Sequence, residues 1–309
     1  MTLFALIVAL LIEQLRPLPA ARVVDAPLKA LARFLENRFN DGQARHGAIA
    51  WWLAILGACF LSALAYFVLW HFHPVLAILF NVMVLYLTMG FRHVSHYFTD
   101  IQLALRMGEL VRARQLIGEW RGRHHDQSSS SEVARLAIEE ALVASHRNVF
   151  AVAFWFILLP GPSGAVLYRL ARFFEKEWGQ RAGSAEFGDF GDFAHRAFAA
   201  LDWIPVRLTA AAFSIVGDFE DGVYCWRAQA SQWTEKASGI LLASGGGALG
   251  VRLGMPIQES GEVLERPEMG IGDDADADFM QSTIGLIWRT LVLVILLLAL
   301  LGVAGWVGN

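Results

Sequence analysis

Cysteine and charge are both scarce in this sequence. Its two cysteines, Cys59 and Cys225, lie far apart in the chain, which excludes a disulfide framework and a CxxC metal site. Charged residues make up 17 % of the chain, whereas soluble proteins usually contain about 25 %. The net charge of −4 provides no basic surface for nucleic acid, so we expect no nucleic-acid partner. The sequence also lacks a Walker-type phosphate loop and a nucleophile elbow.

Apolar residues are abundant instead, at 56 % of the chain and a mean hydropathy of +0.45. A soluble protein of this composition would have to expose large apolar patches to water. A transmembrane helix needs about 20 mostly apolar residues to cross the hydrocarbon core of a bilayer. The composition therefore predicts a multipass membrane protein with the lipid bilayer as its main partner.

Four segments contain no Asp, Glu, Lys or Arg and predict membrane spans: residues 49–72, 74–91, 148–168 and 290–309. The first two are separated only by a short turn before Pro74, which predicts a helical hairpin because proline is tolerated in the first turn of a helix. The third contains Pro160, Gly161 and Pro162. This cluster predicts either a helix ending near Leu159 or a re-entrant turn.

Three further apolar segments leave the number of spans open: residues 1–15, 199–217 and 240–254. The first has no Lys or Arg before its apolar stretch, unlike a secretory signal peptide. We expect an uncleaved anchor or a helix buried in the bundle there.

The loops at residues 16–47 and 92–147 are rich in arginine, which predicts that both lie in the cytoplasm. Apolar spacing predicts one amphipathic helix over residues 97–120 and a second helix capped by Ser131. Residues 262–278 are acidic and predict a surface linker. The predicted fold is all-α: a membrane anchor and hairpin (1–91), a cytoplasmic helical insertion (92–147), and a C-terminal membrane region with re-entrant segments (148–309).

Two groups of residues have types that bind metals or phosphates, but their spacing favours other roles. His93 and His96, like His124 and His125, lack a third ligand at matching spacing, so we expect interfacial or solvated histidines and no metal site. The run from Gly245 to Gly250 fits G-x-G-x-x-G, yet no predicted strand precedes it, and the dinucleotide-binding interpretation fails.

Small residues four positions apart let another backbone approach closely. Gly246, Gly250 and Gly254 have this spacing, so the run predicts close packing, within the chain or in a homo-oligomer. Close approach to a ligand phosphate is the alternative. Asp202 and Arg207 lie in an apolar stretch, where charges usually pair or line a wet cavity. Both interpretations, a structural ion pair and a cavity lining, remain open.

The chain resembles the CobD/CbiB family of membrane proteins. The resemblance is carried by LDWIPVRLTA at residues 201–210, by GALGVRLG at 247–254, and by EVAR at 132–135 with Ile138 and Glu139, running on into residues 151–155. It implies cobalamin biosynthesis, in which such proteins join an aminopropanol-type amine to the corrinoid carboxylate. The product is adenosylcobinamide phosphate or its relative.

One stretch departs from this pattern. The family usually has Glu-Asn-x-x-Asp-Gly ahead of its Phe-Trp pair, whereas residues 143–148 lack both carboxylates and contain Arg147. This departure is similar to the AmpE-type branch. The main functional prediction is therefore an AmpE-like signalling or small-molecule-binding protein linked to cell-wall and β-lactamase regulation. The alternative is a corrinoid amide synthase.

An amide synthase that activates a carboxylate with a nucleotide needs acidic residues for Mg²⁺ or for general base catalysis. The alternative therefore implies ATP and Mg²⁺, with Glu139, Glu140 and Asp202 as candidate catalytic residues. Under either function we expect a small-molecule or corrinoid ligand, because arginine suits phosphate and carboxylate groups. The candidate ligand-binding residues are Arg123, Asp202, Arg207, Gly247, Gly250 and Arg252.

Overall fold

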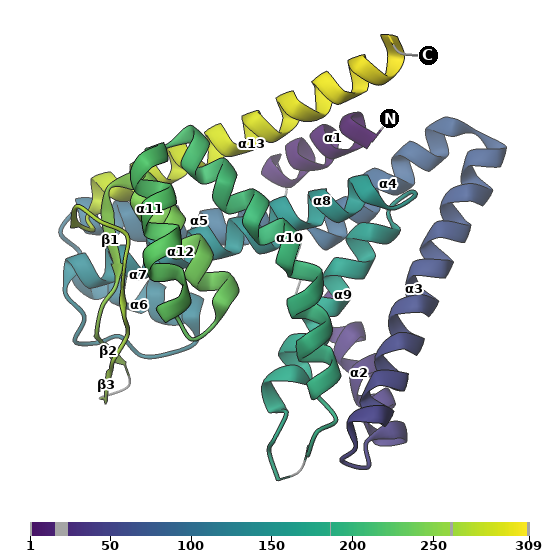
Figure 1. Cartoon of the computed structure of the whole chain (residues 1–309), viewed down its shortest axis with the longest axis horizontal. Coiled ribbons are helices and arrows are strands. Elements are labelled where there is room, and N and C mark those ends of the chain that lie inside the picture. Colours follow the sequence, from purple (N-terminus) through teal and green to yellow (C-terminus); the bar gives the residue numbers. More distant parts are fainter. Residues whose placement is uncertain (1, 16–23, 186, 260–261, 308–309) are drawn as a thin grey trace. The chain divides into compact units, whose positions relative to one another are not determined.

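The computed structural model describes residues 2–15, 24–185, 187–259 and 262–307; the start of the predicted basic loop, residues 16–23, lies outside this set. The described chain is mostly helical (Figure 1). It divides into two compact units. The first comprises Met1–Gly90 and Ala151–Trp203, and the second comprises Phe91–Phe150 and Ile204–Asn309. This grouping differs from the predicted three-part division, which concerns membrane topology and stays a prediction.

The first unit contains the predicted helical hairpin. Helix α3 (Ala44–Phe72) and helix α4 (Pro74–Thr88) are separated by His73 alone. The His73 side chain accepts a hydrogen bond from the backbone N–H of Val75 and so caps α4. Much of the α3 surface is apolar and exposed, including Phe60 and Leu61. Such a surface fits lipid as its solvent.

Two N-terminal helices pack onto this hairpin and its neighbours. Helix α1 (Thr2–Leu15) contacts α4 and helix α8 (Ala151–Leu158), and it buries Ala5, Leu6 and Ala9. This agrees with the expected helix within the bundle. Helix α2 (Ala26–Phe39) contacts α3 and helix α9 (Ser163–Glu177).

The apolar segment 148–168 is broken as its proline and glycine residues predict. Helix α8 ends at Leu158, helix α9 begins at Ser163, and the two helices pack against each other. A Cβ atom on Gly164 would lie 1.8 Å from the carbonyl oxygen of Trp155. Glycine is therefore required where the chain turns back.

By length and composition, four helical segments of the described chain are suited to span a membrane: Ala44–Phe72, Ser130–Leu158, Asp192–Val216 and Ala277–Ala304. The fold is thus an all-α multipass membrane protein, as predicted. One of the four predicted spans needs correction, because the helix after Pro74 has only 15 residues. Residues 148–168 are divided between two helices, as their Pro-Gly-Pro cluster predicts. Helix α10 (Asp192–Val216) runs through Pro205 without ending.

The second unit begins with helices α5 (Phe91–Arg106), α6 (Leu110–Arg121) and α7 (Ser130–Ser145). The prediction of a single helix over 97–120 is wrong. The chain breaks at Gly108, whose φ of +75° is left-handed and favours glycine. The predicted cap at Ser131 is also wrong, because Ser129 caps α7. Ser129 and Glu132 there bond reciprocally to each other's backbone N–H groups.

Helix α7 continues into a short π-helix, η2 (His146–Phe150), and then into α8. Later in the second unit come α11 (Phe219–Gln229), the 3₁₀ turn η4 (Ala230–Gln232), α12 (Lys236–Leu249) and α13 (Ala277–Val307). The predicted apolar segment 240–254 is thus the end of a helix followed by a strand. Its helical residues are buried among protein side chains.

Short strands lie where the sequence predicts a surface linker. Strand β1 (Val251–Gly254) pairs antiparallel with β4 (Glu268–Met269) and parallel with β5 (Asp273–Asp274). Strands β2 (Ile257–Glu259) and β3 (Glu262–Leu264) form a separate hairpin. The linker prediction is wrong because β4 and β5 add to β1, which buries Met269 completely.

Candidate functional site

Charged residues of the second unit gather along one face of α7. Glu132, Arg135 and Glu139 are three and four positions apart, a spacing that places side chains on the same side of a helix. Arg135 and Glu139 are both buried, with 6 % and 5 % of their surface exposed. Charged side chains at such depth need partners.

Glu139 finds its partners in the segment that follows β1. Arg266 Nη1 lies 2.7 Å from Glu139 Oε2, and Arg266 Nη2 lies 3.3 Å from Glu139 Oε1. The backbone N–H of Gly254 donates to Glu139 Oε1 at 2.8 Å. Arg266 also donates to the carbonyl oxygens of Gly254 and Met255, and its guanidinium lies 5.4 Å from the ring centroid of Trp233. We call Glu139, Gly254 and Arg266 the clasp.

The clasp holds β1 and the segment around Arg266 against α7. Both carboxylate oxygens of Glu139 accept hydrogen bonds within the protein. The contacts of this candidate catalytic residue are therefore structural ones, to Gly254 and Arg266. Glu140, the next candidate, is half-buried. Because successive residues are about 100° apart around a helix, Glu140 lies on a different side of α7.

The glycine-rich run packs closely within the second unit. A Cβ atom on Gly247 would lie 2.4 Å from the carbonyl oxygen of Asp221, and one on Gly246 would lie 3.0 Å from the Cα of Gly270. Gly250 has a φ of +67° and ends α12, the usual place of a left-handed glycine. These contacts support the packing interpretation for Gly246 and Gly247. A homo-oligomer through Gly246, Gly250 and Gly254 stays a prediction.

The remaining candidate ligand residues are dispersed. Arg252 pairs with Asp274 at 2.8 Å on neighbouring strands, whereas Arg123 is exposed in the loop after α6. Asp202, in the first unit, is buried and accepts a hydrogen bond from Tyr168 Oη at 2.8 Å. Arg207 follows on the same helix but belongs to the second unit.

The π-helix η2 contains a buried polar pair that the sequence analysis missed. His146 Nδ1 lies 2.9 Å from Thr209 Oγ1 on α10, and both residues are buried. Next to it, Arg147 forms an ion pair with Glu235, which also accepts from Ser238 Oγ. Single π-helical turns are frequent at functional sites. Residues 143–148, where the sequence departs from the usual family pattern, include both His146 and Arg147. This departure is the feature of the sequence that could have identified them.

The other histidines considered above have different surroundings. Within the described chain, no three His, Cys, Asp or Glu side chains lie close enough to hold a metal ion. His96 pairs with Asp100 at 2.9 Å. His125 is buried rather than solvated, which corrects that expectation, and the His93 side chain lies outside the described residues.

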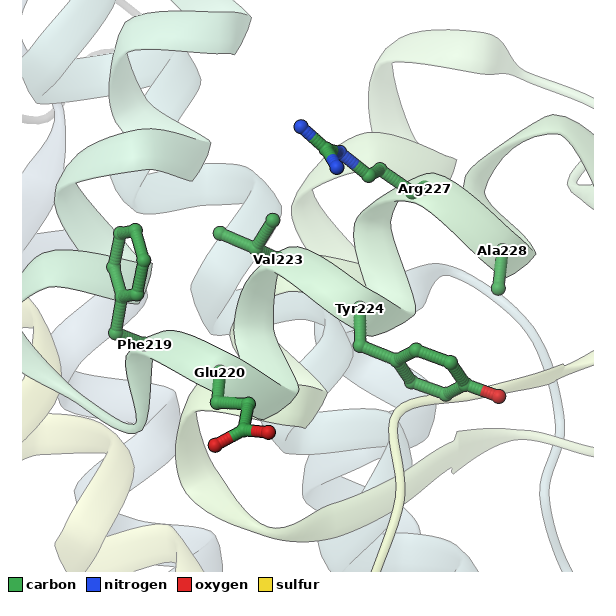
Figure 2. A pocket seen from close by; sticks show the side chains of 6 residues that line it. All are labelled: Phe219, Glu220, Val223, Tyr224, Arg227 and Ala228. Atoms are coloured by element: carbon green, nitrogen blue, oxygen red, sulfur yellow. The ribbon is translucent and has the colours of Figure 1, made fainter.

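A hollow of about 620 Å³ lies over the exposed face of α11 (Figure 2). Two rows of side chains line it along the helix. Phe219, Val223 and Arg227 form one row. Glu220, Tyr224 and Ala228 form the other. None of the residues singled out from the sequence lies in this hollow.

Comparison with known proteins identifies the relatives of this fold. The model of the CobD/Cbib protein family matches residues 3–287, which include both compact units almost entirely. The chain belongs to the CobD/CbiB family. A relative from Stutzerimonas stutzeri, named cobalamin biosynthesis protein CobD, is 35 % identical over 287 residues, which cover 91 % of each chain.

Two further relatives have names of the same kind. A cobalamin biosynthesis protein CobD from Chromobacterium violaceum is 38 % identical over 199 residues, covering 64 % of this chain and 63 % of the relative. The cobalamin biosynthesis protein CbiB from Salmonella typhimurium is 25 % identical over 86 % of this chain and 85 % of its own. No solved structure matches the chain.

These findings place the chain in a family whose named members are cobalamin biosynthesis proteins. They favour the alternative functional prediction over the main one, and the AmpE-like signalling prediction has no support among them. The difference at residues 143–148 is confined to a short stretch, whereas the family match extends over residues 3–287.

Proposed function

We propose that this CobD/CbiB protein is a corrinoid amide synthase, which joins an aminopropanol-type amine to a corrinoid carboxylate. The family match over residues 3–287 carries the proposal. Two relatives that align with 91 % and 86 % of this chain are named as cobalamin biosynthesis proteins, which supports the proposal. The product would be adenosylcobinamide phosphate or its relative.

Formation of an amide from a carboxylate consumes an activating nucleotide, for which ATP with Mg²⁺ is the expected cofactor. The described residues do not fit a magnesium site, because Glu139 is already bonded to Arg266 and Gly254 and no three metal-binding side chains gather. Asp202, the other buried candidate, accepts from Tyr168. The described residues therefore provide no ligand set for Mg²⁺.

When the amine nitrogen attacks the activated carboxylate, the amide C–N bond forms, the activating group departs with its bonding electrons, and the nitrogen must lose a proton. A general base within hydrogen-bonding reach speeds this step. We propose His146 as that base. It follows directly on α7, in the stretch where the family usually has its carboxylates. Thr209, whose hydroxyl lies within hydrogen-bonding distance of Nδ1, would orient the ring. Glu139 would act as a positioning residue through the clasp.

Complementation tests the proposed function. The chain is expressed in a bacterial strain that lacks its own corrinoid amide synthase, under conditions where growth requires cobalamin. We expect rescue by the wild-type chain and by Arg112→Met, an exposed control on α6. We expect loss of rescue by His146→Ala, and partial rescue by Thr209→Val. Immunoblotting of membranes verifies equal amounts of each variant.

Failure of the wild-type chain to rescue, at normal membrane levels, would overturn the synthase proposal. Rescue by His146→Ala would overturn only the assignment of the base.

The same membranes test a second proposal, that the protein resides in the inner membrane. The basic loops and the four apolar helices support it. Separation of inner and outer membranes on a sucrose gradient should place the protein with the inner membrane.

A further inference from the structure

Arg135 is a buried cation whose hydrogen bonds are incomplete. Its Nη1 donates to the thioether sulfur of Met255 at 3.4 Å, and its Nη2 donates to the carbonyl oxygen of Pro256 at 3.2 Å. Its Nε is buried and has no hydrogen-bond partner. A thioether is a weak acceptor, so one neutral carbonyl is the main partner of a side chain that is 6 % exposed.

The acidic groups around Arg135 already have partners. Glu139, Glu132 and Asp274 are the carboxylates near enough to interact with it electrostatically, and Arg266 is a second cation nearby. Glu139 is bonded to Arg266, Glu132 takes part in the cap of α7, and Asp274 pairs with Arg252. The guanidinium of Arg135 is therefore hydrogen-bonded to none of these carboxylates, although a buried charge normally requires a partner.

The segment that covers Arg135 has a strained backbone. Met255 has a φ of +63° and is the single non-glycine residue with a positive φ in the described chain. The left-handed region is unfavourable for residues with a side chain, and such strain gathers at ligand sites. Both groups that contact Arg135 belong to Met255 and Pro256. Rotation at Met255 would release the strain and uncover the guanidinium together.

We infer that Arg135 is an oxyanion-binding residue, which takes a phosphate or carboxylate group when the Met255–Pro256 segment moves aside. A planar guanidinium with a free Nε and free Nη hydrogens binds such groups through paired hydrogen bonds. Binding of the anion exchanges the contacts of Arg135 with the Met255 sulfur and the Pro256 carbonyl for hydrogen bonds to two charged oxygen atoms. This inference does not depend on the proposed synthase activity, since any ligand with an oxyanion satisfies the site.

Thermal unfolding of the whole chain, purified in an uncharged detergent, tests the inference. Inorganic phosphate at 50 mM, with the ionic strength matched by sodium chloride, should raise the Tm of the wild-type protein by about 3 °C, the size expected for a ligand at roughly ten times its Kd. The rise should vanish in Arg135→Met. The exposed control Arg112→Met should keep it.

The Tm of Arg135→Met without phosphate separates a binding role from a structural one. Methionine keeps the apolar stem and removes the buried charge, so a binding role predicts a Tm equal to or above that of the wild type. A residue that merely holds Met255 and Pro256 would instead lower the Tm when replaced. That fall, or an equal phosphate effect in both proteins, overturns the inference.

A second arm identifies the source of the oxyanion. Phosphatidylglycerol added to the micelles offers a lipid phosphate, and phosphatidylcholine serves as the zwitterionic control. A shift with inorganic phosphate supports a soluble ligand, whereas a shift with phosphatidylglycerol alone supports a lipid headgroup. No Arg135-dependent shift with either probe overturns the inference. The complementation assay stays a separate measurement, so the two proposals fail independently.

Discussion

Arg266 and Glu139 join two parts of the second unit that are 127 residues apart in sequence. Their side chains are 9 % and 6 % exposed, and each forms further hydrogen bonds to the backbone of β1 or the residue after it. The ion pair thus fastens the glycine-containing strand β1 to helix α7. The stability of this unit and the position of Met255 both depend on it.

Glu139→Gln should destabilise the protein by about 3–5 kcal/mol, because it leaves the guanidinium of Arg266 buried without its counter-ion. The measurement is chemical or thermal unfolding of the protein in detergent micelles. Glu140→Gln, one position along the same helix, is the matched control and should change stability by less than about 0.5 kcal/mol. Equal stability of the two variants would show that the clasp does not hold the unit together.

Gly247→Ala should cost about 1–3 kcal/mol, since its new Cβ atom would lie 2.4 Å from the carbonyl oxygen of Asp221 and the two helices would have to separate. Gly57→Ala in α3 is the control. A Cβ atom there meets nothing within 4 Å, and alanine favours a helix interior over glycine. The measurement compares the Tm values of Gly247→Ala and Gly57→Ala with that of the wild type. A Gly247→Ala variant as stable as the wild type would contradict the close packing.

The hairpin, the helix break and the packing role of the glycines are predictable because their signals are local. Pro74 between two uncharged runs predicts the hairpin. The cluster at Pro160 cannot continue a helix. The glycines of the run are close enough in sequence to share a helix face. Each of these features is determined by residues within one or two helical turns.

The clasp and the strands are not predictable in this way. Arg266 looks like any charged residue of an acidic linker, and nothing near it indicates a partner on α7. Strands β4 and β5 have two residues each, too few to show the alternation that identifies a strand. They exist because β1 offers them backbone hydrogen bonds. Gly108, by contrast, is a local signal of a helix break within residues 97–120, because glycine is unfavourable in a helix interior.

Cys225 should react very slowly with maleimide in the folded protein. It is buried on α11, and burial raises the pKa of its thiol to about 11, with the charge of Asp221 acting in the same direction. At pH 8 only about one thiol in a thousand is then a thiolate, the reactive form. Mass spectrometry of the Cys59→Ala protein should find labelling after denaturation and almost none before it.

The sign of the pH dependence follows from this raised pKa. The thiol holds its proton to a higher pH in the folded than in the unfolded chain, so its contribution to stability is complete below the unfolded pKa of about 9. It falls as the pH rises toward 11. The difference in unfolding free energy between the wild type and Cys225→Ala should therefore shrink between pH 9 and 11. A constant difference would contradict the raised pKa.

The hairpin at His73 makes the membrane topology testable. If α3 crosses the bilayer and α4 returns, the arginine-rich segments 16–47 and 92–147 lie on the same side of the membrane. Single cysteines at Gln43 and Gln127, which are exposed, should then react with a membrane-impermeant maleimide only in inverted vesicles. A cysteine at His73 should react only in intact spheroplasts.

Helix α4 makes this experiment decisive. Its 15 residues extend about 22 Å, less than the ~30 Å of the hydrocarbon core. The crossing therefore requires local thinning of the bilayer, or it is completed by the residues after Thr88. If α4 instead stays within one leaflet, Gln127 labels from the same side as His73 and the opposite side from Gln43. That pattern would place Arg135 and its oxyanion on the outer face, away from cytoplasmic nucleotides and phosphorylated amines, and would overturn the predicted orientation of the second unit.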